Sequence, residues 1–245
     1  MTFKDRCYQR YVSTHITHRK GEVTLDRMRD DFPVWDKHFG RLLPTNPDAR
    51  ILDVGCGHGA LVYWLGQRGY RNAEGIDLSA EQVATAERLG IGNVRRGDIT
   101  GYLGSRSGYY NGLILRDVIE HFSRDEILEI LRLARCALRP GGTIILQVPN
   151  AESPFFGRIR YGDFTHEIAF SASSLVQVLQ LTGYHRIRLR STSPVVRSLP
   201  SLVRVGLWKG VEAFYRLLLF AEVGGGGRIV TQGIIAAADR PLECA

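Results

Sequence analysis

The sequence predicts an α/β fold with a doubly wound, mostly parallel sheet whose two faces are covered by helices. Between residues 50 and 150, short segments of strand-forming residues alternate with segments whose apolar residues recur at helical spacing. The strand segments lack polar alternation, which is typical of parallel strands buried on both sides. A chain of 245 residues, 44% of them hydrophobic, can form one domain around one substantial core.

The first strand is expected at residues 51–54, and it leads into a glycine-rich turn before a helix. Gly55, Gly57 and Gly59 let the backbone turn tightly and let a ligand approach the amide groups. Free amides at a helix start favour a carboxylate or a phosphate. Because Gly55-x-Gly57-x-x-Ala60 also fits the dinucleotide fingerprint, the turn predicts a ligand without identifying it.

The other elements of the core follow in alternation. Ser79 with Gln82, and Ser123 with Glu126, have the spacing of capping boxes and predict two helix starts. Residues 139–142 (Arg-Pro-Gly-Gly) are expected to end the second of these helices. The expected strands are residues 74–78, 93–99, 112–116 and 143–148, and the expected helices are residues 79–89 and 123–139.

Three aspartates follow strands of the predicted sheet. Asp53, Asp77 and Asp98 end the first, second and third strands, and ligands of such sheets lie beyond the carboxyl ends of the strands. A carboxylate after the second strand can accept hydrogen bonds from both hydroxyls of a ribose. Each aspartate can instead cap a helix or a turn, and Ser79 immediately after Asp77 strengthens that alternative.

Charge and cysteine usage narrow the class of protein. The net charge of +7 suggests anionic partners, although the arginines are dispersed along the chain. The four cysteines lie far apart in the sequence, without the close pair of a zinc knuckle, and the first residues lack the apolar core of a signal peptide. These features predict a protein of the reducing cytoplasm.

Across roughly residues 45–190, the chain resembles the class I S-adenosylmethionine-dependent methyltransferases in the segments ILDVGCGHGALVYWL, GIDLSAEQVATAERLG, NVRRGDIT, LILRDVIEHF and LRPGGTIILQVPN. The resemblance implies a Rossmann-like sheet of seven strands with an antiparallel last strand, and S-adenosylmethionine as the cofactor. It also implies three parts of one enzyme. These are a helical lid and acceptor segment at residues 1–45, the methyltransferase core at 46–190, and an inserted helix with the closing strand at 191–245.

The same resemblance assigns the cofactor site. The amides of the glycine turn would hold the methionine part, Asp77 the ribose, and Asp98 the adenine amino group. Asp53 would order the turn and stand near the cationic methionine part. The expected cofactor-binding residues are Asp53, Gly55, Gly57, Gly59, Asp77, Leu78, Asp98, Ile99 and Asp117.

Methyl transfer to a hydroxyl requires alignment of the reacting atoms and a base for the proton. Histidine titrates near neutrality, so His166 and His121 are the candidate bases, and His166 is preferred. Its segment, residues 161–167, resembles the substrate-side insertion of members that methylate sugars. Asp163 or Asp117 is expected to orient the ring. The alternatives are a structural hydrogen bond for His166 and simple packing beneath the cofactor for His121.

A metal site is the other interpretation of these side chains. Asp117, Glu120, His121 and His166 contain the ligand types for a magnesium-like ion, as in the ubiquinone-pathway O-methyltransferases, which have a similar stretch after the fourth strand. Adjacent Glu120 and His121 are expected to point in different directions. We therefore expect no metal site.

The resemblance extends to methyltransferases of bacterial surface-polysaccharide assembly, which implies transfer to a sugar hydroxyl of a glycan or glycolipid precursor. The alternatives are a small-molecule or quinone-precursor O-methyltransferase and a catalytically inactive subunit that binds cofactor and acts as a scaffold. Enzymes that methylate the amino groups of bases carry an Asn/Asp-Pro-Pro-aromatic turn after the fourth strand, whereas this chain has Arg-Asp-Val-Ile at residues 116–119. Nucleic acid is therefore not the expected acceptor.

Strand patterns at residues 185–189 and 228–237 suit the closing antiparallel pair, and residues 199–223 between them form an amphipathic pattern. Its charged side carries Arg204, Lys209, Glu212 and Arg216, and its apolar side carries Val203, Leu207, Val211, Phe214 and Leu218. The internal charges argue against a transmembrane span. We expect this helix to cover the sheet or a partner subunit. Contact with the inner face of a membrane and a homodimer interface are the alternatives.

Overall fold

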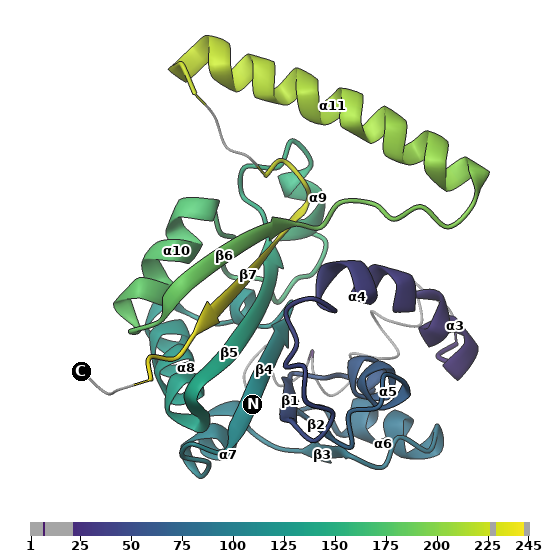
Figure 1. Ribbon diagram of the computed structural model, residues 1–245, viewed down its shortest axis with the longest axis vertical. Coiled ribbons are helices and arrows are strands. Elements are labelled where there is room, and N and C mark those ends of the chain that lie inside the picture. Colours follow the sequence, from purple (N-terminus) through teal and green to yellow (C-terminus); the bar gives the residue numbers. More distant parts are fainter. Residues whose placement is uncertain (1–6, 8–21, 226–228, 243–245) are drawn as a thin grey trace.

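The computed structural model describes residue 7 and residues 22–225 and 229–242, and it confirms the predicted fold. Seven strands form one sheet in the order β3-β2-β1-β4-β5-β7-β6, with helices on both faces (Figure 1). The strands are parallel from β3 to β5, while β7 runs antiparallel between β5 and β6. The strands are β1 (Arg50–Val54), β2 (Asn72–Asp77), β3 (Val94–Arg96), β4 (Tyr110–Arg116), β5 (Leu138–Pro149), β6 (His185–Ser191) and β7 (Gly233–Asp239).

Two helices begin at the predicted caps, Ser79 and Ser123. Ser123 and Glu126 form a complete capping box, whereas Ser79 accepts a hydrogen bond from Gln82 N and the Gln82 side chain contacts His58 in the glycine turn instead. The helices are α3 (Leu25–Asp30), α4 (Phe32–His38), α5 (Ala60–Gln67), α6 (Ala80–Arg88), α7 (Ile99–Gly104), the 3-10 turn η2 (Ile119–His121), α8 (Arg124–Ala137), α9 (Phe156–Arg160), α10 (Ala172–Leu181) and α11 (Leu199–Val223).

Each face of the sheet has its own hydrophobic core. Successive strand residues alternate between the faces, so that Leu52 packs with α7, α8 and α10 while Ile51 packs with α3 to α6. On the second face, the fully buried ring of Trp64 lies edge-on to Trp35 of α4 and to Phe39, and its Nε1 donates to Asp36. The N-terminal helices are thereby held against α5.

The structure corrects several predicted boundaries. β3 ends at Arg96, and a short helix that the sequence analysis did not predict, α7, begins at Ile99. The carboxylate of Asp98 caps this helix, because it accepts from Gly101 N (2.8 Å) and from the Thr100 hydroxyl (2.6 Å). The next strand, β5, begins at Leu138, directly after α8, so residues 139–142 belong to a strand. β7 begins at Gly233, and residue 228 lies outside the described residues.

Residues 199–223 do not cover the sheet, and the alternative that they cover a partner subunit stays a prediction. α11 stands apart from the sheet above α4 and α9 in Figure 1, and the apolar side chains Leu207, Phe214 and Leu218 are exposed. Within the described part of the chain, no helix is both long enough and apolar enough to cross a membrane. Of the N-terminal segment predicted as a lid, α3 and α4 are described, whereas residues 1–6 and 8–21 lie outside the described residues.

We predict that Trp64→Ala lowers the free energy of unfolding by about 3–5 kcal/mol, because the substitution empties a fully buried aromatic position. Urea denaturation would measure it. Leu181→Ala, at an exposed position of α10, is the matched control and should change stability by less than about 0.5 kcal/mol. Equal effects of the two substitutions would contradict the packing of α5 described above.

Candidate functional site

The carboxyl ends of β1 to β4 bring the predicted cofactor residues to one edge of the sheet. β1 and β4 are neighbours in the sheet. The chain continues from β1 to β2 on one side and from β4 to β5 on the other side. The glycine turn therefore follows β1 at the topological switch point, where sheets of this type hold their ligands. Val118, just beyond β4, lies against this turn, since a Cβ atom on Gly55 would come within 2.7 Å of Val118 Cγ2.

The glycines of the turn have the conformation that the sequence predicted. Gly55, Gly57 and Gly59 have φ angles of 69°, 57° and 78°, in the left-handed region that other residues rarely adopt. Gly59 is the N-cap of α5. These angles fold the chain back over the ends of β1 and β2.

Three amides of this turn, which are expected to face a ligand, donate to acceptors within the protein. Gly57 N donates to Asp77 Oδ2 (2.8 Å), Cys56 N to Ile76 O (2.9 Å) and Gly59 N to Cys56 O (3.0 Å). The left-handed turn folds back on β2, and the protein itself uses these donors. Asp77 Oδ1 also accepts from Ser79 N (2.8 Å).

Two further carboxylates lie near the end of the parallel strands. Asp53 is 2% exposed, and burial raises its pKa to about 7, with nearby Asp77 raising it further and Arg116 opposing the shift. Hydrogen bonds from Gly101 and Thr100 hold the pKa of Asp98 below its ordinary value. Asp53 is thus a buried acid close to its point of ionisation at neutral pH.

The remaining predicted cofactor residues surround this edge. Leu78 follows Asp77 and is 46% exposed, and Ile99 is the first residue of α7. Asp117 is exposed, has a φ of 57°, and accepts from Gln147 Nε2 at 3.1 Å. An exposed leucine beside a carboxylate combines an apolar surface with a hydrogen-bond acceptor.

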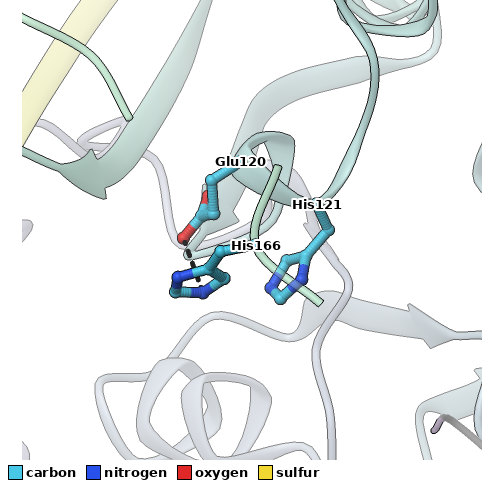
Figure 2. Close-up of side chains that lie close together, drawn as sticks. All are labelled: Glu120, His121 and His166. Carbon is cyan, nitrogen blue, oxygen red and sulfur yellow. Dashed lines mark ion pairs between the residues drawn. The ribbon is translucent and has the colours of Figure 1, made fainter. Parts of the chain in front are cut away.

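Beyond β4, three side chains converge in a group that we call the Glu-His cluster: Glu120, His121 and His166 (Figure 2). One ligand-type atom from each residue lies within 4.8 Å of the others, and the centroids of the two imidazole rings are 4.7 Å apart. The expectation that Glu120 and His121 point in different directions is therefore wrong. Both belong to the tight turn η2, and the segment that carries His166 packs against it.

Hydrogen bonds identify which nitrogen of each histidine is protonated. The Thr165 hydroxyl donates to Asp163 Oδ1 (2.6 Å), so His121 Nδ1, 2.8 Å from that hydroxyl, must be the donor to it. His166 Nδ1 lies 3.1 Å from Ile159 O and can only donate to it. In the neutral rings, Nε2 therefore carries the lone pair.

The expectation that Asp163 orients the preferred base is corrected by these bonds. Asp163 acts through Thr165 on His121, whereas the backbone carbonyl of Ile159 orients His166. Sequence reasoning did not assign a role to Thr165. The signal was present, because Asp163 and Thr165 have the two-residue spacing of an Asx turn, and Thr165 N donates to Asp163 Oδ1.

Burial controls the charge state of the cluster. Glu120 is fully buried, and within the described residues neither of its carboxylate oxygens has a hydrogen-bond partner. Burial raises the pKa of Glu120 well above its ordinary value, and Asp117 adds to the shift. Burial, with a contribution from His166, lowers the pKa of His121 to about 4, so this ring is neutral at pH 7. His166 Nε2 lies 3.9 Å from Glu120 Oε1.

Comparison with known proteins identifies the family. The sequence matches the methyltransferase domain over residues 28–189. The chain belongs to the methyltransferase domain family. A crystal structure of a SAM-dependent methyltransferase from Archaeoglobus fulgidus aligns with a TM-score of 0.64 at 19% identity, covering 87% of this chain and 96% of that one. The predicted class, an S-adenosylmethionine-dependent methyltransferase domain, is confirmed.

Curated methyltransferases match about half of this chain or less. A ribosomal RNA small subunit methyltransferase C from Chromohalobacter salexigens is 33% identical in an alignment of 126 residues that covers 47% of this chain and 36% of the relative. A ubiquinone biosynthesis O-methyltransferase from Xanthomonas campestris is 29% identical over 109 residues, which are 42% of this chain and 44% of the relative. The match covers less than half the length of each.

We predict that Asp53→Asn changes how stability depends on pH. Wild-type Asp53 has a pKa of about 7 when folded and an ordinary value of 3.8, so its ionisation opposes folding as pH rises between these values. Asn removes this penalty, and the stability of the variant relative to wild type should rise with pH by up to about 4 kcal/mol. Urea denaturation at several pH values measures it.

The matched control is Leu181→Asn, which introduces the same side chain at an exposed position without removing a carboxylate, and its stability relative to wild type should stay constant across the same range. If the difference between Asp53→Asn and wild type is also constant with pH, the buried ionisation inferred for Asp53 is wrong.

Proposed function

We propose that this protein is an O-methyltransferase that transfers the methyl group of S-adenosylmethionine to a sugar hydroxyl of a glycan or glycolipid precursor, with His166 as the general base. The observation that carries the proposal is the lone pair of His166 Nε2, directed by the Nδ1 hydrogen bond to Ile159 and facing Glu120. The proposal keeps the cytoplasmic location that the sequence predicts.

The residues at the sheet edge fit the cofactor. Asp77 uses each carboxylate oxygen in one hydrogen bond and keeps acceptor capacity for ribose hydroxyls. Leu78 offers an apolar surface beside it. Asp53, whose charged form is disfavoured by burial, would gain stability from a cationic neighbour. Asp98 and Ile99 would bind the adenine, although the carboxylate of Asp98 already caps α7.

S-adenosylmethionine supplies a methyl group already activated by a positive sulfur. The protein therefore has to align the acceptor and remove its proton. We assign proton removal to His166 Nε2, since a proton bound there lies next to Glu120. His121 suits the task less well, because its pKa of about 4 makes it a weak base at neutral pH. Asp163 and Thr165 fix the ring of His121 beside His166.

The surroundings of His166 support a sugar acceptor with negative charge. Phe155, Tyr161 and Phe164 expose their rings on the same segment of the chain, and exposed aromatic groups of this kind often mark a binding surface for flat, partly apolar ligands. Arg158 of α9 is exposed among them. With a net charge of +7, the protein attracts phosphorylated precursors.

We predict that His166→Gln lowers kcat by about 100-fold or more, because the proton loses its acceptor. Affinity for S-adenosylhomocysteine should change by less than about twofold, since His166 is assigned to the acceptor and not to the cofactor. Turnover of methyl-labelled S-adenosylmethionine on nucleotide-linked and lipid-linked glycan pools, together with calorimetry, measures both.

The matched control is His185→Gln on β6, outside the Glu-His cluster, which should retain wild-type kcat. Full turnover by His166→Gln with normal cofactor binding would exclude His166 as the base. Cofactor binding by wild type without turnover on any pool would favour a scaffold subunit. Turnover on ribosomal RNA alone would favour the acceptor class named for the Chromohalobacter relative.

A metal-assisted O-methyltransferase acting on a small molecule or quinone precursor is the second candidate. The Glu-His cluster favours it, because two histidine nitrogens and a buried carboxylate within 4.8 Å match a three-ligand metal site. A bound cation would also compensate the unpartnered Glu120 oxygens and lower the pKa of an acceptor hydroxyl. In that case His166 would be a ligand and could not be the base.

The two mechanisms predict opposite responses to chelation. With His166 as the base, enzyme treated with EDTA should keep wild-type kcat, and added Mg²⁺, Mn²⁺ or Zn²⁺ should not increase it. With a metal, EDTA should abolish turnover, and one of these ions should restore it in wild type but not in Glu120→Gln. Restoration of this kind would overturn the general-base assignment.

A further inference from the structure

The long helix α11 exposes its apolar side to solvent. Six side chains form a continuous stripe along it, which we call the outer face: Leu199, Val203, Leu207, Phe214, Leu217 and Leu218. Leu207, Phe214 and Leu217 are 70%, 57% and 63% exposed. At 100° per residue, the outer face includes no charged residue along the helix, and only glycine and alanine lie between its large side chains.

The opposite side of α11 faces the rest of the protein and buries a charged residue. Glu212 is 4% exposed, and its carboxylate accepts from Trp208 Nε1 (2.9 Å) and Lys209 Nζ (2.7 Å). Burial lowers the pKa of Lys37 in α4, Lys209 lowers it further, and Glu212 opposes the shift. This side of α11 therefore lies near α4. Most surface helices turn their large apolar side chains toward the core, whereas α11 leaves many of them exposed.

The linker before α11 fixes this orientation. Lys37 Nζ donates to Pro194 O (2.8 Å), and His38 Nε2 lies 3.2 Å from Ser193 O. The Ser198 hydroxyl accepts from Ser201 N in a capping box that begins the helix. The chain is therefore held on α4 shortly before α11, and α11 itself stands away from the sheet (Figure 1).

Arginines lie beyond the exposed apolar surface on both sides. At 100° per residue, Arg204 follows Leu218 on one side, while the exposed Leu202 and Phe220 continue the apolar surface from Leu199 toward Arg216 on the other. Of the two acidic residues in α11, Glu212 is buried and only Glu222 is exposed. Long basic side chains can extend from the edge of an apolar stripe to a plane of negative charge.

We propose that the outer face of α11 binds the surface of a membrane that contains anionic lipids. Its 25 residues would lie flat over about 37 Å, with the apolar stripe among the acyl chains and the arginines beyond it at the headgroups. Charge favours lipid over a second copy of the chain, because two molecules of net charge +7 repel each other. This proposal does not depend on the acceptor or the base.

The test is flotation of the full chain with vesicles of phosphatidylcholine alone and with vesicles in which about a third of the lipid is phosphatidylglycerol. Wild type should float with the second kind, and raising the salt concentration should weaken the binding. The double variant Leu207→Glu with Phe214→Glu should lower the partition coefficient by about tenfold or more, because each glutamate places a charge in the apolar stripe.

The matched control is Leu181→Glu with Leu242→Glu, which adds the same charge at exposed leucines outside α11, and it should bind nearly as wild type does. Sedimentation measures the oligomeric state of all three proteins. Absence of wild-type binding, or equal loss in both double variants, would overturn the proposal. A wild-type dimer that dissociates only when Leu207 and Phe214 are replaced would overturn it in favour of self-association.

Discussion

The carboxylate of Asp77 is the constraint on which the arrangement of the site depends. Its two oxygens accept from the amides of Gly57 and Ser79, and so join the turn after β1 to the start of the helix after β2. The parallel register of β1 and β2 places these segments side by side. Removing the carboxylate would leave an amide of the turn without a partner, a loss of about 1–3 kcal/mol where the group is buried. One side chain thus shapes the turn and still presents acceptor lone pairs to a ligand.

In the Glu-His cluster, by contrast with Asp77, hydrogen-bond acceptors lie close together without a donor between them. The Nδ1 atoms of His121 and His166 are committed to Thr165 and Ile159, and Glu120 brings a buried carboxylate. Such a group is stable only when a proton or another cation is shared within it. Both mechanisms considered above use that same deficit of positive charge, which explains why the same residues can serve either.

The sequence was sufficient for the parts of the fold that local patterns determine. Buried strands such as residues 51–54, the positive φ angles of Gly55 and Gly59, and the cap at Ser123 follow from residue type and spacing. The short helix α7 was missed because two glycines among its six residues weaken any helical pattern.

The chemistry of the site was less accessible to local reasoning. The internal use of the turn amides and the convergence of Glu120 with His121 depend on tertiary geometry, namely the fold of the turn over β2 and the tight winding of η2. The outward direction of the apolar side of α11 has the same origin, since periodicity defines two sides of a helix but not which side meets the protein.

The position of β7 bears on the order in which the molecule can be assembled. β7 pairs with β5 on one side and β6 on the other, although it follows both in the chain and is separated from β6 by α11. During synthesis, one edge of β5 therefore remains unpaired, and β6 has no strand to pair with, until the polypeptide has been extended past residue 239. Open sheet edges invite association between chains, so the nascent protein is most exposed to aggregation just before its final strand emerges.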